Sequence, residues 1–274
     1  MAITIDHTGK SAIVTGAGAG IGREIARWLA RAGAAVGVVD IRRTNAEAVV
    51  AEIVADGGTA IPIGANFRND DEIRAAVAQV VAAFGGLDIA VNNIGMIPPG
   101  RTTKAISEYR GDDWRDIVDQ NLVLAGLSAG AEVEAMLAQQ RSADWQGTIL
   151  FVTSGETTRP SPHNAIYASA KAALNHLVTS LAVEVGHEGI RVLAIAPGTT
   201  DTEQVRAVFS DDRLQAIAEA TPLRRAVDHD ELGRLAVFLT SDLARCITGQ
   251  FILADAGAFL SRTRPTFATA NRDA

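Results

Sequence analysis

The chain has 274 residues, of which 47% are hydrophobic and 21% are charged, and its formal net charge at pH 7 is −7. This length suits one α/β domain, which can bury a core without disulfides or a structural metal. No block of consecutive basic residues could track a phosphate backbone, so a nucleic-acid partner is not expected. The single cysteine, Cys246, cannot form an intrachain disulfide, and no Cys/His cluster has zinc-site spacing. We therefore expect no metal and a reducing compartment.

The N-terminal segment MAITIDHTGK lacks the basic start and the apolar run of a signal peptide. No later stretch offers the roughly eighteen uninterrupted apolar residues of a membrane span. These features predict a soluble, cytoplasmic protein with no membrane partner.

Short β-branched runs alternate with longer amphipathic segments, which is typical of βαβ units around a parallel sheet. We predict seven strands, at 12–15, 35–40, 60–64, 89–92, 148–153, 192–196 and 251–253. Helices are predicted at 21–32, 45–56, 70–84, 112–139, 166–186 and 230–239. No linker divides these elements, so residues 1–274 are expected to form a single Rossmann-type, doubly wound α/β domain with helices on both faces of the sheet.

Two segments, 96–111 and 198–225, interrupt this alternation, and both follow the C-terminal ends of strands. Because ligands bind at that edge of an open parallel sheet, we expect these segments to form the walls of a substrate cleft. The tail, 261–274, is polar and non-periodic, which predicts either disorder or docking on a partner subunit.

A glycine-rich turn, TGAGAGIG, joins the first strand to the first helix. Glycines at 16, 20 and 22 permit backbone angles barred to other residues and let the chain approach a pyrophosphate, which would face the helix N-terminus. A turn made only for tight packing is the alternative. The placement between a strand and a helix favours a dinucleotide site.

Asp40 ends the second strand, close to the spacing at which an acidic side chain binds a ribose diol. A helix-capping or loop aspartate is the alternative interpretation. An aspartate here repels a 2′-phosphate and so favours NAD over NADP, although Arg42 and Arg43 would soften that preference.

The fourth strand ends in NNIG, residues 92–95. Paired amides at a strand end can cap free backbone groups, and we expect this structural role for at least one of Asn92 and Asn93. Gly95 would let the nicotinamide half of a cofactor come close.

Tyr167 and Lys171 are four residues apart on a predicted helix, so their side chains share one face. A phenol with a reference pKa of about 10 exchanges protons poorly at neutral pH, and a nearby ammonium favours its phenolate form. Ser154 ends the fifth strand, where its hydroxyl can hydrogen-bond a substrate oxygen that gains charge. Alone, Ser154 would be interpreted as a strand-end serine.

Together these motifs resemble the short-chain dehydrogenase/reductase family over residues 9–260. The matching motifs are TGxxxGxG (15–22), the acidic Asp40, NNxG (92–95), Asn121 in DQNL, Ser154, YxxxK (167–171), PGxxxT (197–202) and the late ITGQ. The resemblance implies an NAD(P)-dependent oxidoreductase that acts on CH–OH groups, moving a hydride between NAD(H) and a secondary alcohol or ketone.

The resemblance also implies residue roles. Tyr167 would be the general acid/base, and Lys171 would lower its pKa and bind the nicotinamide ribose. Ser154 would orient and polarise the substrate oxygen, and Asn121 would hold a water that relays protons to Lys171. The implied cofactor-binding residues are Gly16, Gly18, Gly20, Ile21, Gly22, Asp40, Ile41, Asn66, Phe67, Asn92, Asn93, Ile94, Gly95, Tyr167, Lys171, Pro197, Gly198, Thr200 and Thr202. Because family members are commonly tetramers, a homotetramer is expected, with the helices at 112–139 and 166–186 as subunit contacts.

Two departures from the family pattern concern the cofactor: Asn66 stands in place of an aspartate that faces the adenine, and Ile94 replaces a small residue. Two other functions stay open. A methyltransferase shares the glycine turn but does not need the Tyr167 and Lys171 pair. A non-catalytic NAD-binding regulatory protein could use the same fold, since fold does not fix function. The expected substrate pocket comprises 96–99, 155–159, His163 and the loop from 199, and neither substrate nor direction follows from the sequence.

Overall fold

The structure is a computed structural model that describes residues 4–97, 103–140, 142, 144–206 and 209–260. The strands are β1 (Ser11–Thr15), β2 (Ala35–Asp40), β3 (Thr59–Gly64), β4 (Ile89–Asn92), β5 (Gly147–Val152), β6 (Ile190–Pro197) and β7 (Gln250–Ala254). The α-helices are α1 (Gly20–Arg31), α2 (Arg43–Ala55), α3 (Asp70–Phe84), α4 (Gly111–Val118), α5 (Leu124–Ala138), α6 (Ala165–Val185), α7 (Glu203–Arg206), α8 (Asp211–Ala220) and α9 (His229–Thr240). The tail 261–274 lies outside the described residues.

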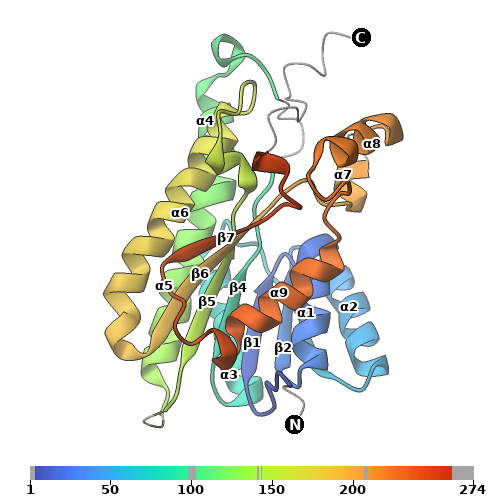
Figure 1. Ribbon diagram of the computed structural model, residues 1–274. Coiled ribbons are helices and arrows are strands. Elements are labelled where there is room, and N and C mark those ends of the chain that lie inside the picture. The colour runs from blue at the N-terminus through green and yellow to red at the C-terminus, as the bar shows by residue number, and fades with distance from the viewer. Residues whose placement is uncertain (1–3, 98–102, 141, 143, 207–208, 261–274) are drawn as a thin grey trace.

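All seven strands are parallel and form one sheet in the order β3-β2-β1-β4-β5-β6-β7 (Figure 1). The chain order reverses between β1 and β4, and the crevice at such a reversal is where ligands bind in open α/β sheets. The predicted doubly wound α/β fold is confirmed. Each predicted strand overlaps an observed one, with ends that agree within two residues.

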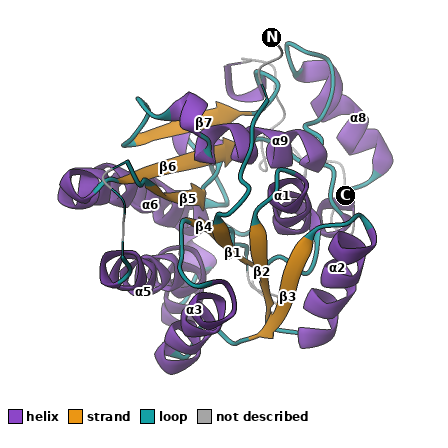
Figure 2. Cartoon of the chain, turned by 90° about the horizontal axis from the view of Figure 1, so that it is seen from below, coloured by secondary structure: helices purple, strands orange, loops and turns teal. Residues whose placement is uncertain are grey.

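Helices cover both faces of the sheet, because alternate strand residues point to opposite sides (Figure 2). Ile13 of β1 joins a core formed with α3, α5 and α6. Val14, its neighbour, joins the core formed with α1, α2 and α9. Both side chains are fully buried, which explains why the central strands are apolar on both sides.

The helix predicted at 112–139 is continuous but changes its winding in the middle. Between α4 and α5, residues Asp119–Val123 form one π-helical turn, which the periodicity did not predict. Such turns hold one extra residue and often occur at functional sites. A second difference is α8, in the segment predicted to be irregular, where the Ser210 side chain caps the helix by accepting from the Arg213 amide.

The helical run Gly111–Ala138 is long and apolar enough to cross a membrane by length and composition alone. In the fold it packs against α3 and α6, and Leu124, Ala129 and Met136 lie in the core. We interpret it as a core helix of the domain. Val123 and Leu127 remain exposed along its outer side.

Candidate active site

The glycine turn between β1 and α1 has the backbone that the sequence predicts. Gly16 and Gly20 have φ angles of 61° and 55°, in the left-handed region that glycine tolerates best. At Gly22 a side chain has no room, because an added Cβ would lie 2.4 Å from the Gly16 carbonyl oxygen. The turn therefore depends on glycine at these three positions.

Asp40 lies at the end of β2 beside this turn. Its Oδ2 accepts a hydrogen bond from the Gly18 amide at 3.2 Å, and its Oδ1 accepts from the Arg42 amide at 2.9 Å. The two neighbouring guanidinium groups have other partners: Arg42 donates to the Asn45 amide oxygen at 3.1 and 3.2 Å, and Arg43 donates to Glu47 at 3.0 Å. The carboxylate and the glycine turn thus form one surface.

Asn92, the last residue of β4, and Asn93, which follows it, both make structural contacts. The Asn93 side chain donates to the carbonyls of Thr15 and Gly16 at 3.2 and 3.0 Å, which ties β4 to the glycine turn. The Asn92 side chain is buried and donates to Glu132 Oε2 on α5 at 2.7 Å. The predicted capping role is confirmed for Asn93. Because the Asn92 side chain faces α5, a contact of Asn92 with a cofactor would have to come from its backbone.

Gly95, Lys171 and Asn121 meet just beyond β4. An added Cβ on Gly95 would lie 2.3 Å from Lys171 Nζ and 3.1 Å from Asn121 Oδ1. The π-helical turn holds Asn121, whose Nδ2 donates to the carbonyls of Met96 and Ile117 at 2.8 and 2.9 Å. Asn121 Oδ1 is buried and has no hydrogen-bond partner in the described chain. It is therefore a free acceptor on the same side of Gly95 as the Lys171 ammonium.

Lys171 is 1% exposed, and its Nζ donates to the Val152 carbonyl at 2.9 Å. Burial lowers the pKa of Lys171 to about 8, because the ammonium has lost its water. This helix, α6, also supplies Tyr167, and Lys171 Nζ lies 6.0 Å from the centre of the Tyr167 ring. The predicted arrangement of the two side chains on one helical face is confirmed.

The pKa of Tyr167 differs from what the sequence led us to expect. Burial raises it to about 12, a hydrogen bond with Ser154 lowers it, and the charge of Glu156 raises it. Lys171 was expected to lower this pKa. In the structure its ammonium is 6.0 Å from the ring centre and is bound to Val152, so loss of hydration outweighs its effect.

Ser154 precedes a 3-10 turn, Gly155–Thr158, and hydrogen bonds hold both its side chain and its carbonyl. Its Oγ accepts from the Glu156 amide at 3.2 Å, and its carbonyl accepts from Thr157 Oγ1 at 2.9 Å. Thr157 Oγ1 in turn accepts from Asn175 of α6 at 2.9 Å. The serine is therefore held against the helix that carries Tyr167.

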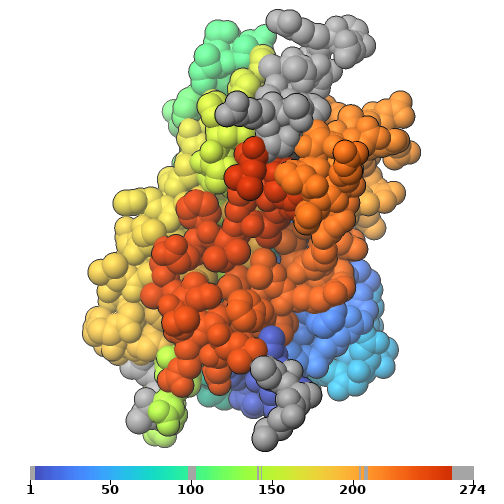
Figure 3. Space-filling model, in the orientation of Figure 1, coloured from blue at the N-terminus to red at the C-terminus, as the bar shows by residue number. Residues whose placement is uncertain are grey.

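Phe259 covers this turn. A Cβ on Gly155 would lie 2.3 Å from the Phe259 ring, so the aromatic ring occupies the side-chain space of the glycine. The Arg159 guanidinium stacks on the same ring at 4.9 Å. Figure 3 shows the segment from α9 to Leu260, in orange and red, lying between the yellow α6 and the blue N-terminal helices. Arg159 thus belongs to this cover, and sequence reasoning gave no sign of Phe259.

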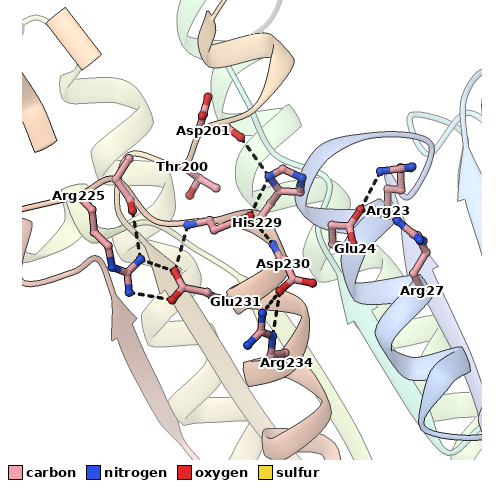
Figure 4. A network of polar contacts seen from close by, with 12 residues as sticks. Arg23, Glu24, Arg27, Thr200, Asp201, Arg225, His229, Asp230, Glu231 and Arg234 are labelled. Carbon is pink, nitrogen blue, oxygen red and sulfur yellow. Dashed lines mark hydrogen bonds and ion pairs between the residues drawn. The ribbon is translucent and has the colours of Figure 1, made fainter. Parts of the chain in front are cut away.

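The loop after β6 is anchored to α9. Thr200 and Val227 form an isolated β-bridge, and the Asp201 carbonyl oxygen accepts from His229 Nδ1 at 3.1 Å. Figure 4 shows this contact beside the bidentate pair of Arg225 with Glu231, which closes at 2.6 and 2.7 Å. These contacts fix the PGxxxT segment at the same sheet edge as β4 and β5.

The remaining predicted residues vary in accessibility. Ile41 is 68% exposed and Asn66 is exposed, whereas Phe67 is buried in the core of the α3 face. Ile21, Ile94 and Gly198 are partly buried, and Pro197, Thr200 and Thr202 are buried. Of the expected pocket, residues 98 and 99 lie outside the described part. His163, expected in the pocket, has a φ of 63° and its carbonyl accepts from Tyr109, so it lies in a loop that its backbone conformation and this bond hold in place.

Two buried carboxylic residues lie near the site. Glu156, in the expected pocket segment 155–159, is 8% exposed, and its Oε2 accepts from Ser161 Oγ at 2.8 Å. Glu132, which sequence reasoning did not single out, is fully buried behind β4. Among the residues that the structure describes, no three His, Cys, Asp or Glu side chains gather as a metal site would need.

Comparison with known proteins places this geometry in a family. Residues 16–258 match the family model described as enoyl-(acyl carrier protein) reductase. The chain is 34% identical over 256 residues to a short chain dehydrogenase/reductase of Aspergillus oryzae, covering 92% of this chain and 95% of that protein. It is 35% identical over 252 residues to the 3-oxoacyl-(acyl-carrier-protein) reductase FabG of Staphylococcus epidermidis, covering 92% and 99%.

A solved structure of 7α-hydroxysteroid dehydrogenase, complexed with NADH and 7-oxo glycochenodeoxycholic acid, has a TM-score of 0.85 and 33% sequence identity to this chain. The match covers 93% of this chain and 96% of that one. Sequence, fold and the placement of Ser154, Tyr167 and Lys171 therefore agree. The chain belongs to the short-chain dehydrogenase/reductase family of nicotinamide-dependent oxidoreductases.

Proposed function

We propose that this enzyme transfers a hydride between NAD(H) and a secondary alcohol or ketone, with Tyr167 as the general acid/base. The observation that carries the proposal is the hydrogen-bonded pair of Tyr167 and Ser154, with buried Lys171 beside it, at the reversal point of the sheet. A nicotinamide cofactor, when bound, would supply or accept the hydride.

The residues present fit such a cofactor. Gly16 and Gly20 hold a turn that leads into the N-terminus of α1, which would stabilise an anionic pyrophosphate. Gly95 leaves the strand end open beside Lys171, because no side chain separates the two. Asp40 presents a carboxylate next to Gly18 for a ribose diol.

In the reducing direction, Tyr167 would donate its proton to the substrate oxygen as that oxygen gains charge. The raised pKa keeps the phenol protonated at neutral pH, so the proton is available. In the oxidising direction the phenol must first lose this proton. The Ser154 hydroxyl, which already bonds to Tyr167, would hold the substrate oxygen within reach.

Lys171 and Asn121 would supply the route for the proton. Because the pKa of Lys171 is lowered to about 8, its side chain can give or take a proton near neutral pH. Asn121 Oδ1 is an acceptor without a partner in the described chain, beside Lys171 and Gly95. A water bound there would connect the ammonium to the solvent side, as the family resemblance implies.

The cofactor is proposed to be NAD in preference to NADP. Asp40 would repel a 2′-phosphate, and Arg42 and Arg43, which could bind one, are held by Asn45 and Glu47. NAD should bind at least tenfold more tightly than NADP, which corresponds to about 1.4 kcal/mol. Titration of both cofactors tests this, and equal or reversed affinities would show that one of the arginines has taken over the site.

The assembly is proposed to be a homotetramer that uses the outer faces of α5 and α6. Val183 on α6 is 84% exposed, and Val123 and Leu127 are exposed at the start of α5. Such apolar side chains are commonly covered by a second subunit. A cytoplasmic location is proposed from the single, free Cys246, which suits a reducing compartment.

A reaction screen tests the function. Alcohols and ketones, including steroids and 3-oxoacyl thioesters, are offered with NAD or NADH while the nicotinamide absorbance is followed. Turnover that Tyr167→Phe abolishes supports the proposal. If no substrate in a broad panel turns over although NAD binds, the non-catalytic regulatory role is favoured instead.

A further inference from the structure

A carboxylic acid and an amide are buried together behind β4, on the side away from the cofactor turn. Glu132 of α5 is 0% exposed and Asn92 is 2% exposed. Asn92 Nδ2 donates to Glu132 Oε2 at 2.7 Å, which uses one atom of each group. The other atom of each group, Glu132 Oε1 and Asn92 Oδ1, is buried and has no hydrogen-bond partner in the described chain.

Both of these unpaired oxygen atoms lack a hydrogen-bond donor. An ionised carboxylate and an amide oxygen are both acceptors, so neither can satisfy the other. Each buried acceptor left unpaired destabilises the fold, because it has lost its hydrogen bonds to water and gained none in return. One proton on Glu132 removes both deficits, because the acid O–H donates to the amide oxygen while the amide N–H donates to the acid carbonyl.

The charged groups around Glu132 offer no ionic partner. On the elements packed against α5, Arg74 of α3 pairs with Glu134, Arg68 pairs with Asp119, and Lys171 of α6 donates to Val152. Burial raises the pKa of Glu132 to about 8, and the hydrogen bond from Asn92 is the influence that lowers it. A buried carboxyl without a cation is stable in its neutral form.

The pair connects two parts of the cofactor site. Asn92 is the last residue of β4, directly before Asn93, which holds the glycine turn. Glu132 lies on α5, which continues from the π-helical turn that places Asn121. A bond between the two fixes the distance from that turn to the strand end.

We propose that Glu132 is a protonated acid that closes a ring of two hydrogen bonds with Asn92 and so acts as a positioning residue for the cofactor site. The positioning role rests on the proposed function. The protonation state does not, since it can be measured by unfolding without cofactor or substrate.

The test compares the full-length wild type with Glu132→Gln, which can make the same two hydrogen bonds as a neutral amide. Urea unfolding is measured from pH 5.5 to 7.5. A carboxyl whose pKa is raised in the folded state contributes stability that is present below its unfolded pKa and is lost as pH rises through the folded pKa. The wild-type unfolding constant should therefore rise relative to Glu132→Gln by about tenfold per pH unit, or about 100-fold over this range.

Glu134→Gln is the matched control, because Glu134 lies two residues away on the same helix and is exposed, with Arg74 as its partner. Its unfolding should follow the wild type at every pH. If Glu132→Gln also runs parallel to the wild type, Glu132 is not a protonated acid and the proposal is wrong.

The positioning role is tested by NADH binding, followed by fluorescence. Glu132→Gln should bind NADH within twofold of the wild type, whereas Glu132→Leu, which leaves the Asn92 amide unpaired, should bind it at least fivefold more weakly. Equal binding by Glu132→Leu would overturn the positioning role. If Glu132→Leu does not fold, Asn92→Leu in the Glu132→Leu background restores an apolar pair and should recover the fold but not NADH affinity.

Discussion

The ammonium of Lys171 lies against the Cα of Gly95, where an added Cβ would come within 2.3 Å of Nζ. Gly95→Ala should therefore push the ammonium away from the Val152 carbonyl that now holds it. Because the displaced atom is the end of a flexible side chain, the fold should survive. Turnover should fall about tenfold or more, measured as kcat at saturating cofactor, and unchanged turnover would show that the position of the ammonium is not critical.

Tyr167→Phe should remove nearly all activity, since it deletes only the hydroxyl that exchanges a proton. General acid–base catalysis by one group typically contributes about a hundred- to ten-thousandfold in rate. NAD affinity should change little. The matched control is Tyr109→Phe, which loses a hydrogen bond to the His163 carbonyl at 3.0 Å and should stay active. Substantial activity in Tyr167→Phe would contradict the assignment of the acid/base.

Glu156→Gln should shift the pH dependence of oxidation toward lower pH. Burial raises the pKa of Tyr167, Ser154 lowers it, and the negative charge of Glu156 raises it again. Removing that charge makes the phenolate easier to form, so the rising limb of kcat against pH should move down by up to about one pH unit. Ser161→Ala keeps the charge but loses the bond to Glu156, and its profile should not move down. An unchanged profile for Glu156→Gln would mean that Glu156 does not act on the tyrosine.

Asp40→Ser should reduce the preference for NAD over NADP. The substitution removes the carboxylate that repels a 2′-phosphate and keeps a hydroxyl for the Gly18 amide. The ratio of the two dissociation constants should fall about tenfold, mainly through tighter NADP binding. Calorimetric titration of both cofactors gives this ratio. A fall caused only by weaker NAD binding would show that Asp40 selects by attraction and not by repulsion.

The strand pattern could be predicted from sequence because central strands such as β1, β4 and β6 are buried on both faces and therefore mostly apolar, although the edge strands β3 and β7 are partly exposed. The observed β2 and β4 have the predicted bounds, and the helix at 70–84 also agrees. The site motifs could be predicted for a similar reason: the glycine turn, Asn93 and the pair of Tyr167 and Lys171 depend on local backbone or on one helical face.

What the sequence could not show was long-range burial. Glu132 and Glu134 are both helical glutamates two residues apart, yet one is buried against Asn92 and the other is exposed with Arg74. The pKa of Tyr167 depends on burial and on Glu156, and neither is visible in the YxxxK spacing. Phe259 over Gly155 likewise joins positions more than a hundred residues apart, for which a single sequence carries no signal.

The π-helical turn at Asp119–Val123 makes the number of residues in the helical run from α4 to α5 important for the site. Each residue of an α-helix turns the chain by about 100°, and a π-helical turn holds one residue more than an α-helical turn, so a one-residue deletion within 119–123 would rewind the turn as α-helix with α5 in nearly the same orientation. Asn121 would lose the position from which its amide reaches the Met96 carbonyl, whereas a one-residue deletion farther along α5 would rotate Glu132 away from Asn92. Insertions and deletions should therefore be tolerated in the loops that flank the helix and not within it.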